Sequence, residues 1–486
     1  MTLIKSISGI RGTIGGTVGN NLTPIDIVKY TSAFAFFLRE KTKDQSQDSL
    51  FDNVDSSDEY DRENALKVVV GRDARVSGEM VSNIVCSTLQ SVGVDVVDLG
   101  LSTTPTVEMA VNHHSADGGI IITASHNPMQ WNALKLLNST GEFVSAADAQ
   151  RIIELADSDV VEYSYFDKLG VYTLCENAIQ YHVNAILNLP LVDKNAIAKS
   201  NFKVIIDVVN STGAIALPYL LKQLGVYDIT VLNGEMNGVF AHNPEPIPEN
   251  LAQICSEMSR SKYDVGFVVD PDVDRLSIVC ESGKLMGEEY TLVAVADYVL
   301  QNTPGNTVSN LSSTRALEDV TKKFGTKYTP SAVGEVNVVE MMKKTDAVIG
   351  GEGNGGVIYP ELHYGRDALV GIALFLSFMA KTRKSCTQIR AQYPDYYIVK
   401  KKTELNQDVD PQFILDKLAL KYSSFEVNTI DGVRINFEGS WAHIRSSNTE
   451  PIIRIYAEAL SDNIADNIAS KILLDIRELL NHPNLL

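Results

Sequence analysis

The stretch Asp264–Arg275 reads DVGFVVDPDVDR, an apolar run that ends in a charged loop. Short runs rich in Val and Ile are typical of buried parallel strands. The same unit recurs in four other places: KVVVGRDARVSG from Lys67, GGIIITASHNP from Gly118, KVIIDVVNSTGA from Lys203 and DAVIGGEGNGG from Asp346. Helical patterns often follow these loops. We therefore expect α/β layers, with the polar loops gathered beyond the carboxyl ends of the strands.

Three aspartates alternate in the charged loop: Asp270, Asp272 and Asp274. Alternation puts the carboxylates on one side, where a hard divalent cation would relieve their repulsion, and a site with few protein ligands suits Mg²⁺. An EF-hand is excluded, because Arg275 stands where that loop needs Gly and the flanks read as strands. A phosphatase of the haloacid-dehalogenase type also follows a strand with an Asp-x-Asp pair. A solvated acidic turn is the remaining alternative.

A second polar loop, TASHNP from Thr123, contains Ser125 two residues past the expected strand. A serine nucleophile needs activation. His126 is adjacent in sequence, which is poor geometry for a Ser–His pair, and no triad is evident. Ser125 could instead carry a phosphate whose charge a metal neutralises. A serine in such a loop can also be a simple capping residue.

Two further loops have ligand-binding chemistry. RSSNTEP from Arg445 combines a guanidinium, hydroxyls, an amide and turn N–H groups that can surround a phosphate, although a polar hairpin turn is the alternative. GGEGNGG from Gly350 brings backbone close to a ligand, and Glu352 and Asn354 can bind hydroxyls. GIRG from Gly9 and GRDAR from Gly71 are explained by a tight turn and a local Arg–Asp pair.

Composition limits the functional classes. The 486 residues predict about three or four domains. The net charge of −19 argues against non-specific nucleic-acid binding. The five cysteines have no CxxC spacing, and neither a signal peptide nor a membrane span is evident, so we expect a cytoplasmic protein. The acidic segment Asp44–Asn64 reads as a disordered insertion. The last hundred residues alternate in polarity and close with a helix, which predicts a small α+β domain.

In this order, the motifs resemble those of the α-D-phosphohexomutase family over nearly the whole chain. The motifs are SGIRG, GRDARVSG, TASHNP, AHNPEPIPENL, DPDVDRL, GGEGNGG and RSSNTEP. The resemblance implies three related α/β domains with mixed sheets flanked by helices, then a smaller α+β domain, around a central cleft. The expected boundaries are 1–163 with the serine loop, 164–262, 263–384 with the metal and sugar loops, and 385–486 with the phosphate-binding loop.

The resemblance also implies roles for individual residues. Ser125 would be a phosphoserine that completes the Mg²⁺ shell of Asp270, Asp272 and Asp274. The transferred phosphoryl group would have three neighbours, Arg11, His126 and Lys135, with Lys135 or Arg11 as general base. The sugar hydroxyls would meet Glu352 and Asn354. The non-reacting phosphate would be bound by Arg445, Ser447, Asn448 and Thr449.

The implied activity is a phosphohexomutase that interconverts hexose 6-phosphate and hexose 1-phosphate through a 1,6-bisphosphate, as a monomer or homodimer with no nucleic-acid or membrane partner. The sugar loop and GRDAL from Gly365 look most like phosphoglucosamine mutases. A phosphomannomutase/phosphoglucomutase is the alternative, and a Mg²⁺-dependent sugar phosphatase is the alternative of another class. Val273 stands where many members have Gly, a change expected to have little effect, and Ala133 also replaces a Gly. Asn354 and Gly356 replace Ser and His.

Overall fold

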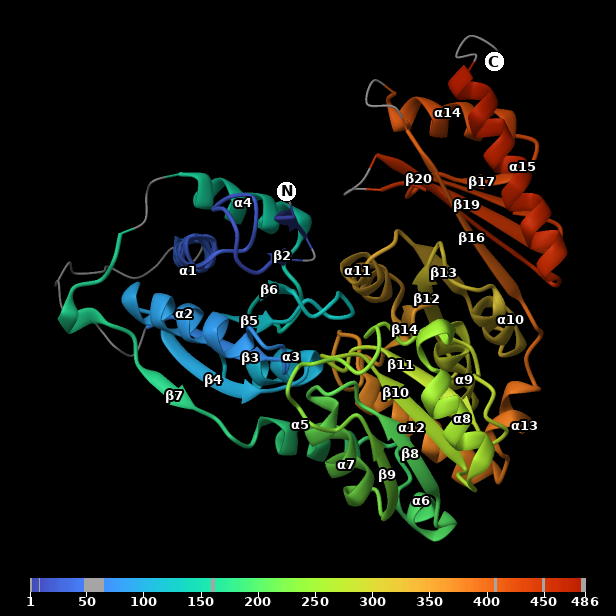
Figure 1. Ribbon diagram of the computed structural model, residues 1–486, viewed down its shortest axis with the longest axis horizontal. Helices are drawn as coiled ribbons and strands as arrows, with labels where there is room; N and C mark the ends of the chain where they lie inside the picture. Colours follow the sequence, from blue (N-terminus) through green and yellow to red (C-terminus); the bar gives the residue numbers. More distant parts are fainter. Residues whose placement is uncertain are drawn as a thin grey trace. The chain divides into compact units, whose positions relative to one another are not determined.

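The computed structural model describes residues 2–7, 9–47, 65–158, 162–405, 409–447 and 451–481. The chain forms two compact units, residues 1–288 with 356–386 and residues 289–355 with 387–486 (Figure 1). Mixed sheets flanked by helices and an antiparallel C-terminal sheet confirm the predicted fold class. The four domain boundaries and the central cleft stay predictions. Among the described residues, no helix is long and apolar enough to cross a membrane.

The larger unit begins with a seven-stranded sheet. In spatial order its strands are β1 (Ile4–Ser6), β2 (Gly9–Thr13), β6 (Trp131–Leu137), β5 (Gly118–Ile122), β3 (Lys67–Arg72), β4 (Asp95–Leu101) and β7 (Tyr172–Leu174). β5, β3, β4 and β7 pair in parallel, and the apolar runs predicted β3 and β5 among them, whereas β6, β2 and β1 are added by antiparallel pairing. The sheet is therefore mixed.

Side-chain alternation gives this sheet two buried faces. Val68 and Val70 of β3 belong to one core and Val69 to another. The first core lies under α1 (Pro24–Gln47), α2 (Gly78–Ser91) and α4 (Ala146–Asp157), and the second under α3 (Thr104–His113). Helices on both faces explain why these strands read as continuous apolar runs.

A second sheet of the larger unit carries the aspartates. In order its strands are β11 (Leu276–Cys280), β10 (Val265–Val269), β8 (Lys203–Asp207) and β9 (Asp228–Leu232), with only β10 and β11 antiparallel. The larger unit also contains α5 (Ala178–Leu187), α6 (Lys194–Ser200), α7 (Gly213–Gln223), α8 (Ala252–Arg260), β15 (Gly356–Ile358) and α12 (Ala368–Thr382). Every residue from Ala368 to Met379 is buried, so α12 is an internal helix.

The smaller unit contains two sheets. In the first, β12 (Asn306–Asn310) pairs in parallel with β13 (Tyr328–Ser331) and β14 (Ala347–Glu352), beside α9 (Glu288–Asn302), α10 (Ala316–Lys323) and α11 (Glu335–Thr345). The second is antiparallel throughout, in the order β16 (Tyr397–Glu404), β20 (Ile452–Ala459), β19 (Ser440–Ser446), β18 (Val433–Phe437) and β17 (Glu426–Asn428). α14 (Pro411–Lys421) and α15 (Asp462–Asn481) cover its apolar face. A short helix, α13 (Cys386–Arg390), lies at the boundary between the units.

Two expectations from composition have specific outcomes. α1 extends to Gln47, so the first residues of the acidic segment predicted from Asp44 are helical, and residues 48–64 lie outside the described residues. All five cysteines are free thiols. Cys280 and Cys386 are far apart in sequence, yet their Sγ atoms lie 3.0 Å apart.

Candidate active site

Three buried aspartates form the loop after β10. Asp270, Asp272 and Asp274 are each 0% exposed, and one oxygen of each lies within 4.8 Å of the others. Asp270 Oδ1 shapes the loop by accepting the backbone N–H groups of Asp274 (3.2 Å) and Arg275 (3.1 Å). Desolvation raises the pKa of Asp270 well above its usual value, and the Asp274 and Asp272 carboxylates raise it further. Such a concentration of buried negative charge favours a bound cation.

Two cations and one hydroxyl contact the aspartate carboxylates, but they leave some of the carboxylate oxygens without a hydrogen-bond partner. Lys135 Nζ lies 2.8 Å from Asp272 Oδ2, and Arg366 Nη2 donates to Asp274 Oδ2 at 2.7 Å. Thr104 Oγ1 donates to Asp272 Oδ2 at 2.6 Å. The buried Oδ1 atoms of Asp272 and Asp274 have no hydrogen-bond partner. An oxygen-only donor set with two unsatisfied buried oxygens fits a hard divalent cation. Neither contact was predicted: Arg366 lies in the motif GRDAL, which was interpreted only as a mark of substrate preference, and Thr104 belongs to no motif.

Ser125 contacts the aspartate cluster directly. Its Oγ donates to Asp270 Oδ2 at 2.7 Å and lies 3.3 Å from His126 Nδ1. Ser125 has φ +48°, a left-handed conformation uncommon for residues other than glycine, and Thr123 Oγ1 accepts its backbone N–H at 2.9 Å. Two loops that are separated by 145 residues in sequence therefore meet, and they meet at the predicted nucleophile and a predicted metal ligand.

Arg75 holds the serine loop in this shape. Its guanidinium, which is fully buried, donates to the backbone carbonyls of Ser125 (2.5 Å), Asn127 (2.7 Å), Pro128 (2.8 Å) and Trp131 (2.9 Å). The carboxylate of Asp73 orients Arg75 at 3.0 Å and also accepts the Thr123 hydroxyl at 2.6 Å. Sequence reasoning assigned this motif only a local Arg–Asp pair. The pair exists, but the four carbonyls that it serves lie about fifty positions away.

Two basic predicted residues share one face of the first sheet. Arg11 of β2 lies opposite Ala133 of β6, and Lys135 is two residues further along β6, so all three side chains point to the same side. Burial lowers the pKa of Arg11, and its Nε is buried without a hydrogen-bond partner. Desolvation lowers the pKa of Lys135, but the Asp272 and Asp274 carboxylates outweigh it, so the net shift is upward. Lys135 is therefore charged at neutral pH.

The third predicted neighbour of the phosphoryl group, His126, is uncharged, unlike Lys135 and Arg11. Desolvation lowers its pKa well below the usual value, and the nearby cations of Arg275 and Arg366 lower it further. The imidazole is therefore neutral at neutral pH. The side chains of neighbouring residues were not expected to meet, yet His126 Nδ1 contacts Ser125 Oγ. The backbone of Ser125 is in the left-handed conformation at this contact.

In the smaller unit, the structure brings the predicted sugar-binding residues Glu352 and Asn354 together. The Glu352 carboxylate is buried at the end of β14 and accepts Asn310 Nδ2 at 2.9 Å, the Gly334 N–H at 3.2 Å and Asn354 Nδ2 at 3.4 Å. Between them, a Cβ at Gly353 would lie 2.0 Å from the Glu289 carboxylate, so a side chain there would have to displace Glu289.

Of the four residues predicted to bind the non-reacting phosphate, the structure describes Arg445 and Ser447. Arg445 of β19 lies directly opposite Arg454 of β20, and its Nε is buried without a hydrogen-bond partner. The Asp431 carboxylate lies 3.7 Å from Nη2. The Ser447 N–H donates to the Ile452 carbonyl at 3.0 Å and closes the hairpin. Asn448 and Thr449 lie outside the described residues. Two guanidiniums on opposite positions of a strand pair repel, which an anion would relieve.

The fold and these loops define a class of protein, and four family models match the chain in order. They are phosphoglucomutase/phosphomannomutase alpha/beta/alpha domain I over residues 55–160, domain II over 180–283, domain III over 287–397 and the C-terminal domain over 400–474. The chain belongs to the phosphoglucomutase/phosphomannomutase family, which is a family of isomerases.

Similar proteins share this family but differ in the sugar that they are named for. A phosphoglucomutase/phosphomannomutase of Thermococcus kodakarensis is 35% identical over 93% of this chain and 95% of its own length. A phosphoglucosamine/phosphogalactosamine mutase of Sulfurisphaera tokodaii is 31% identical over 95% and 97%. The crystal structure of a phosphoglucomutase/phosphomannomutase family protein from Burkholderia thailandensis has 25% identity and a TM-score of 0.80, covering 99% of both chains.

Proposed function

We propose that this chain interconverts hexose 6-phosphate and hexose 1-phosphate through a phosphoserine at Ser125 and a hexose 1,6-bisphosphate. The observation that carries this proposal is the 2.7 Å hydrogen bond from Ser125 Oγ to Asp270 Oδ2, inside a buried cluster of three carboxylates. A capping serine would not need such surroundings. A phosphoserine does, because its phosphate requires a cation beside it.

The cofactor in this proposal is Mg²⁺, held by Asp270, Asp272, Asp274 and the phosphate on Ser125. The all-oxygen donor set and the small number of protein ligands support Mg²⁺ over softer metals. When bound, the ion neutralises charge on the phosphoryl group that is transferred.

Transfer begins with a sugar hydroxyl at C1 or C6 aimed at the phosphorus on Ser125. The hydroxyl oxygen forms a new P–O bond, the bond from phosphorus to Ser125 Oγ breaks, and Ser125 Oγ keeps the electron pair. The hydroxyl proton needs an acceptor. Lys135 or Arg11 was expected to be this base; we propose His126 in their place, because its Nδ1 lies 3.3 Å from Ser125 Oγ and its pKa is lowered by burial. Charged Lys135 and Arg11 stabilise the phosphoryl group instead. The bisphosphate then turns over, and its other phosphoryl group returns to Ser125.

Binding is assigned to the loops of the smaller unit. Glu352 and Asn354 would bind sugar hydroxyls, with the buried carboxylate and the adjacent amide as acceptor and donor. The non-reacting phosphate would be bound by Arg445, Ser447, Asn448 and Thr449, which the unsatisfied Arg445 Nε supports. We also propose a cytoplasmic location, which the five free thiols support.

We propose glucosamine phosphate as the preferred substrate. An acidic chain of net charge −19 favours a sugar with a C2 ammonium, and the relative from Sulfurisphaera tokodaii is named for amino sugars. The name of the Thermococcus kodakarensis relative supports the second candidate, a phosphomannomutase/phosphoglucomutase.

The experiment is kcat/KM for the 6-phosphates of glucosamine, glucose and mannose under one set of conditions, with the 1-phosphate products measured directly. The highest value is expected for glucosamine phosphate. A higher value for glucose or mannose phosphate would replace the substrate but keep the mutase, and release of inorganic phosphate without isomerisation would replace the mutase by a phosphatase.

A further inference from the structure

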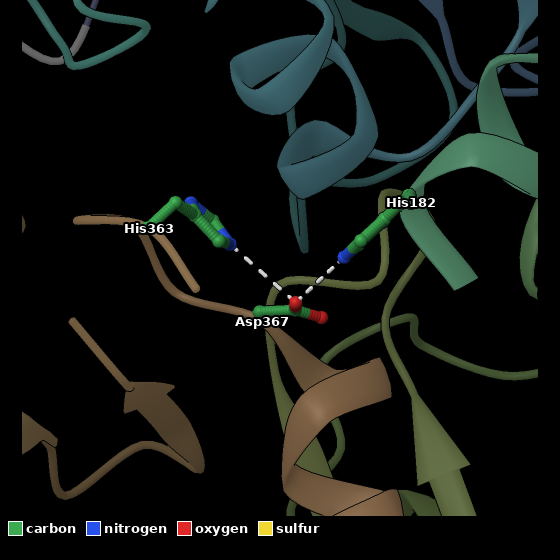
Figure 2. Close-up of side chains that lie close together, drawn as sticks. All are labelled: His182, His363 and Asp367. Carbon is green, nitrogen blue, oxygen red and sulfur yellow. Dashed lines mark hydrogen bonds and ion pairs between the residues drawn. The ribbon is translucent and has the colours of Figure 1, made fainter. Parts of the chain in front are cut away.

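A second group of metal-binding side chains lies in the larger unit, outside the aspartate cluster. His182 of α5, His363 and Asp367, the N-cap of α12, point toward one another (Figure 2). Asp367 Oδ2 lies 2.9 Å from His182 Nε2 and 3.4 Å from His363 Nε2. His182 and Asp367 have completely buried side chains, and His363 is 9% exposed. The segments concerned are separated by up to 185 residues in sequence.

Every other polar atom of these three side chains is already engaged. His182 Nδ1 lies 2.9 Å from Thr106 Oγ1, and His363 Nδ1 lies 3.3 Å from the carboxylate of Glu108. Asp367 Oδ1 accepts two backbone N–H groups at the start of α12, at 2.7 and 3.3 Å. The remaining atoms, two Nε2 and one Oδ2, face one another: both Nε2 atoms share Asp367 Oδ2 as hydrogen-bond partner, and all three atoms lie within 4.8 Å of one another. A histidine whose second nitrogen meets a carboxylate is the usual arrangement around protein-bound zinc.

The backbone is also adapted to bring Glu108 to His363. Gly365 lies so close to this carboxylate that a Cβ would be 1.9 Å from Glu108 Oε2. Any side chain at position 365 would push the carboxylate away from the imidazole. The contact of Glu108 with His363 therefore depends on Gly365, which lies between His363 and Asp367 in the sequence.

We propose that His182, His363 and Asp367 bind one Zn²⁺ ion per chain, with Thr106 and Glu108 as outer-shell partners. Ligand atoms of a tetrahedral zinc site lie roughly 3.3 Å apart, given metal–ligand distances of about 2.0–2.1 Å. The contacts of 2.9 and 3.4 Å match this spacing. Imidazole suits zinc whereas Mg²⁺ prefers oxygen, so the two metal sites select different ions. A divalent ion also balances the two buried carboxylates of Asp367 and Glu108.

The zinc site is structural. It joins α3, through Thr106 and Glu108, to α5 and to the start of α12. It also fixes the segment that contains Arg366, whose Nη2 donates to Asp274 in the aspartate cluster. Zinc should therefore stabilise the fold without replacing Mg²⁺ in catalysis.

The test uses the full chain, stripped of metal with a chelator, desalted and returned to excess Mg²⁺. Zinc is then added, and bound zinc per chain and the thermal midpoint are measured, with the visible absorption of Co²⁺ as a second probe of nitrogen ligation. We expect one zinc per chain, a raised midpoint and a tetrahedral Co²⁺ spectrum. Glu108→Gln should weaken zinc binding about 10–100-fold, as loss of an outer-shell partner does. His182→Gln and His363→Gln should weaken it more.

Two controls make the assignment specific. His242→Gln removes another histidine that pairs with an aspartate, Asp207 at 3.2 Å, but has no third ligand, and it should bind zinc like the wild type. Asp272→Asn should also keep its zinc. The proposal is overturned if zinc is lost with Asp272→Asn rather than with the histidine variants. It is equally overturned if the wild-type chain binds no zinc in excess Mg²⁺, a result that needs no variant to fold and would make the cluster a proton-held ion-pair network only.

Discussion

Val273 stands between two of the three aspartates and has φ +63°. A β-branched residue in the left-handed region is a conformational outlier, and many members of the family have glycine at this position. We expected the replacement to have little effect, since the side chain would point away from the metal. Its side chain is completely buried, so the chain gains apolar contacts there while the backbone stores strain. At this position, burial of the valine side chain stabilises the fold and the left-handed backbone destabilises it.

Replacing Val273 by glycine and by alanine separates these energies. Both changes remove the buried side chain, but alanine keeps the Cβ that disfavours the left-handed conformation by about 1–2 kcal/mol. We expect Val273→Gly to be more stable than Val273→Ala by about 1 kcal/mol in urea unfolding, the reverse of the usual order. A more stable alanine variant would show that the loop relaxes to another conformation.

At the scale of elements, Arg75 joins the loop after β3 to the serine loop through its hydrogen bonds. Removing this guanidinium leaves four carbonyls and the Asp73 carboxylate buried without it. Loss of one partner of a buried ion pair costs about 3–5 kcal/mol. We expect Arg75→Met to lose that much stability, and most mutase activity with it. Arg72→Met is the matched control, since among the described residues the Arg72 guanidinium donates one hydrogen bond, from Nη1 to the Asp73 carbonyl at 3.3 Å, and its loss should cost about 1 kcal/mol. Equal losses in both variants would contradict the role given to Arg75.

The strand β19 contains a histidine that should make the smaller unit sensitive to acid. His443 Nε2 donates to the Asp431 carbonyl at 2.7 Å, and its Nδ1 accepts the Ser312 hydroxyl at 2.8 Å. Desolvation lowers the pKa of His443 from 6.5 to about 4; Asp431 opposes the shift, and the Arg434 and Arg445 cations add to it. Because the folded pKa lies below the unfolded one, the contribution of His443 is fully present above pH 6.5 and is lost as the pH falls to about 4.

The expected result is that the wild type loses on the order of 3 kcal/mol more stability than His443→Gln between about pH 7.5 and about pH 4, because only the wild type takes up a proton at this position on unfolding. Urea unfolding of both proteins at the two pH values measures this difference. Carboxylates that titrate in the same range are common to both chains and cancel. Parallel losses in the two proteins would mean that His443 is protonated in the fold.

Local patterns predicted the elements well, and the contacts between elements poorly. β3, β5, β8, β10 and β14 lie where the apolar runs predicted strands, because burial on both faces leaves a continuous apolar signal. The motif GRDAR shows the limit. Its Arg–Asp pair is visible in the sequence, but the carbonyls that Arg75 binds are backbone atoms of another loop and have no sequence signal. Arg366 and Thr104 beside the aspartates show the same limit, because GRDAL reveals Arg366 but not its bond to Asp274, and Thr104 belongs to no motif.

At the scale of the whole molecule, the metal requirement follows from charge. Three buried carboxylates and the phosphoserine dianion that we propose would concentrate about five negative charges. We expect excess chelator to abolish mutase activity and Mg²⁺ to restore it, whereas Asp272→Asn should stay inactive even in excess Mg²⁺. Asp475→Asn in α15 is the control: Asp475 is also buried and accepts the Tyr422 hydroxyl, but it is remote in sequence from every site residue. Unchanged turnover in excess chelator would remove the metal from the mechanism.

The long-range arrangement of the site could be predicted only through the family. Spacing in the sequence suggested a metal loop and a serine loop separately, but nothing in either loop specifies that Ser125 and Asp270 touch across 145 residues. The order of all the motifs did imply it through the family resemblance, which placed the phosphate of Ser125 in the metal shell of the three aspartates. Of the His182–His363–Asp367 cluster, only Asp367 lies in a quoted motif, so the cluster became visible only when the chain was folded.

The most direct test of the account is the location of the phosphate on the protein. The chain is incubated with hexose 1,6-bisphosphate, digested and mapped by mass spectrometry, with Ser125→Ala treated in parallel. The account predicts one phosphate on the peptide that contains Ser125, and in Ser125→Ala the loss of both this phosphate and mutase activity by several orders of magnitude. Full turnover by Ser125→Ala, or a phosphate trapped on Asp270 instead, would contradict the phosphoserine mechanism.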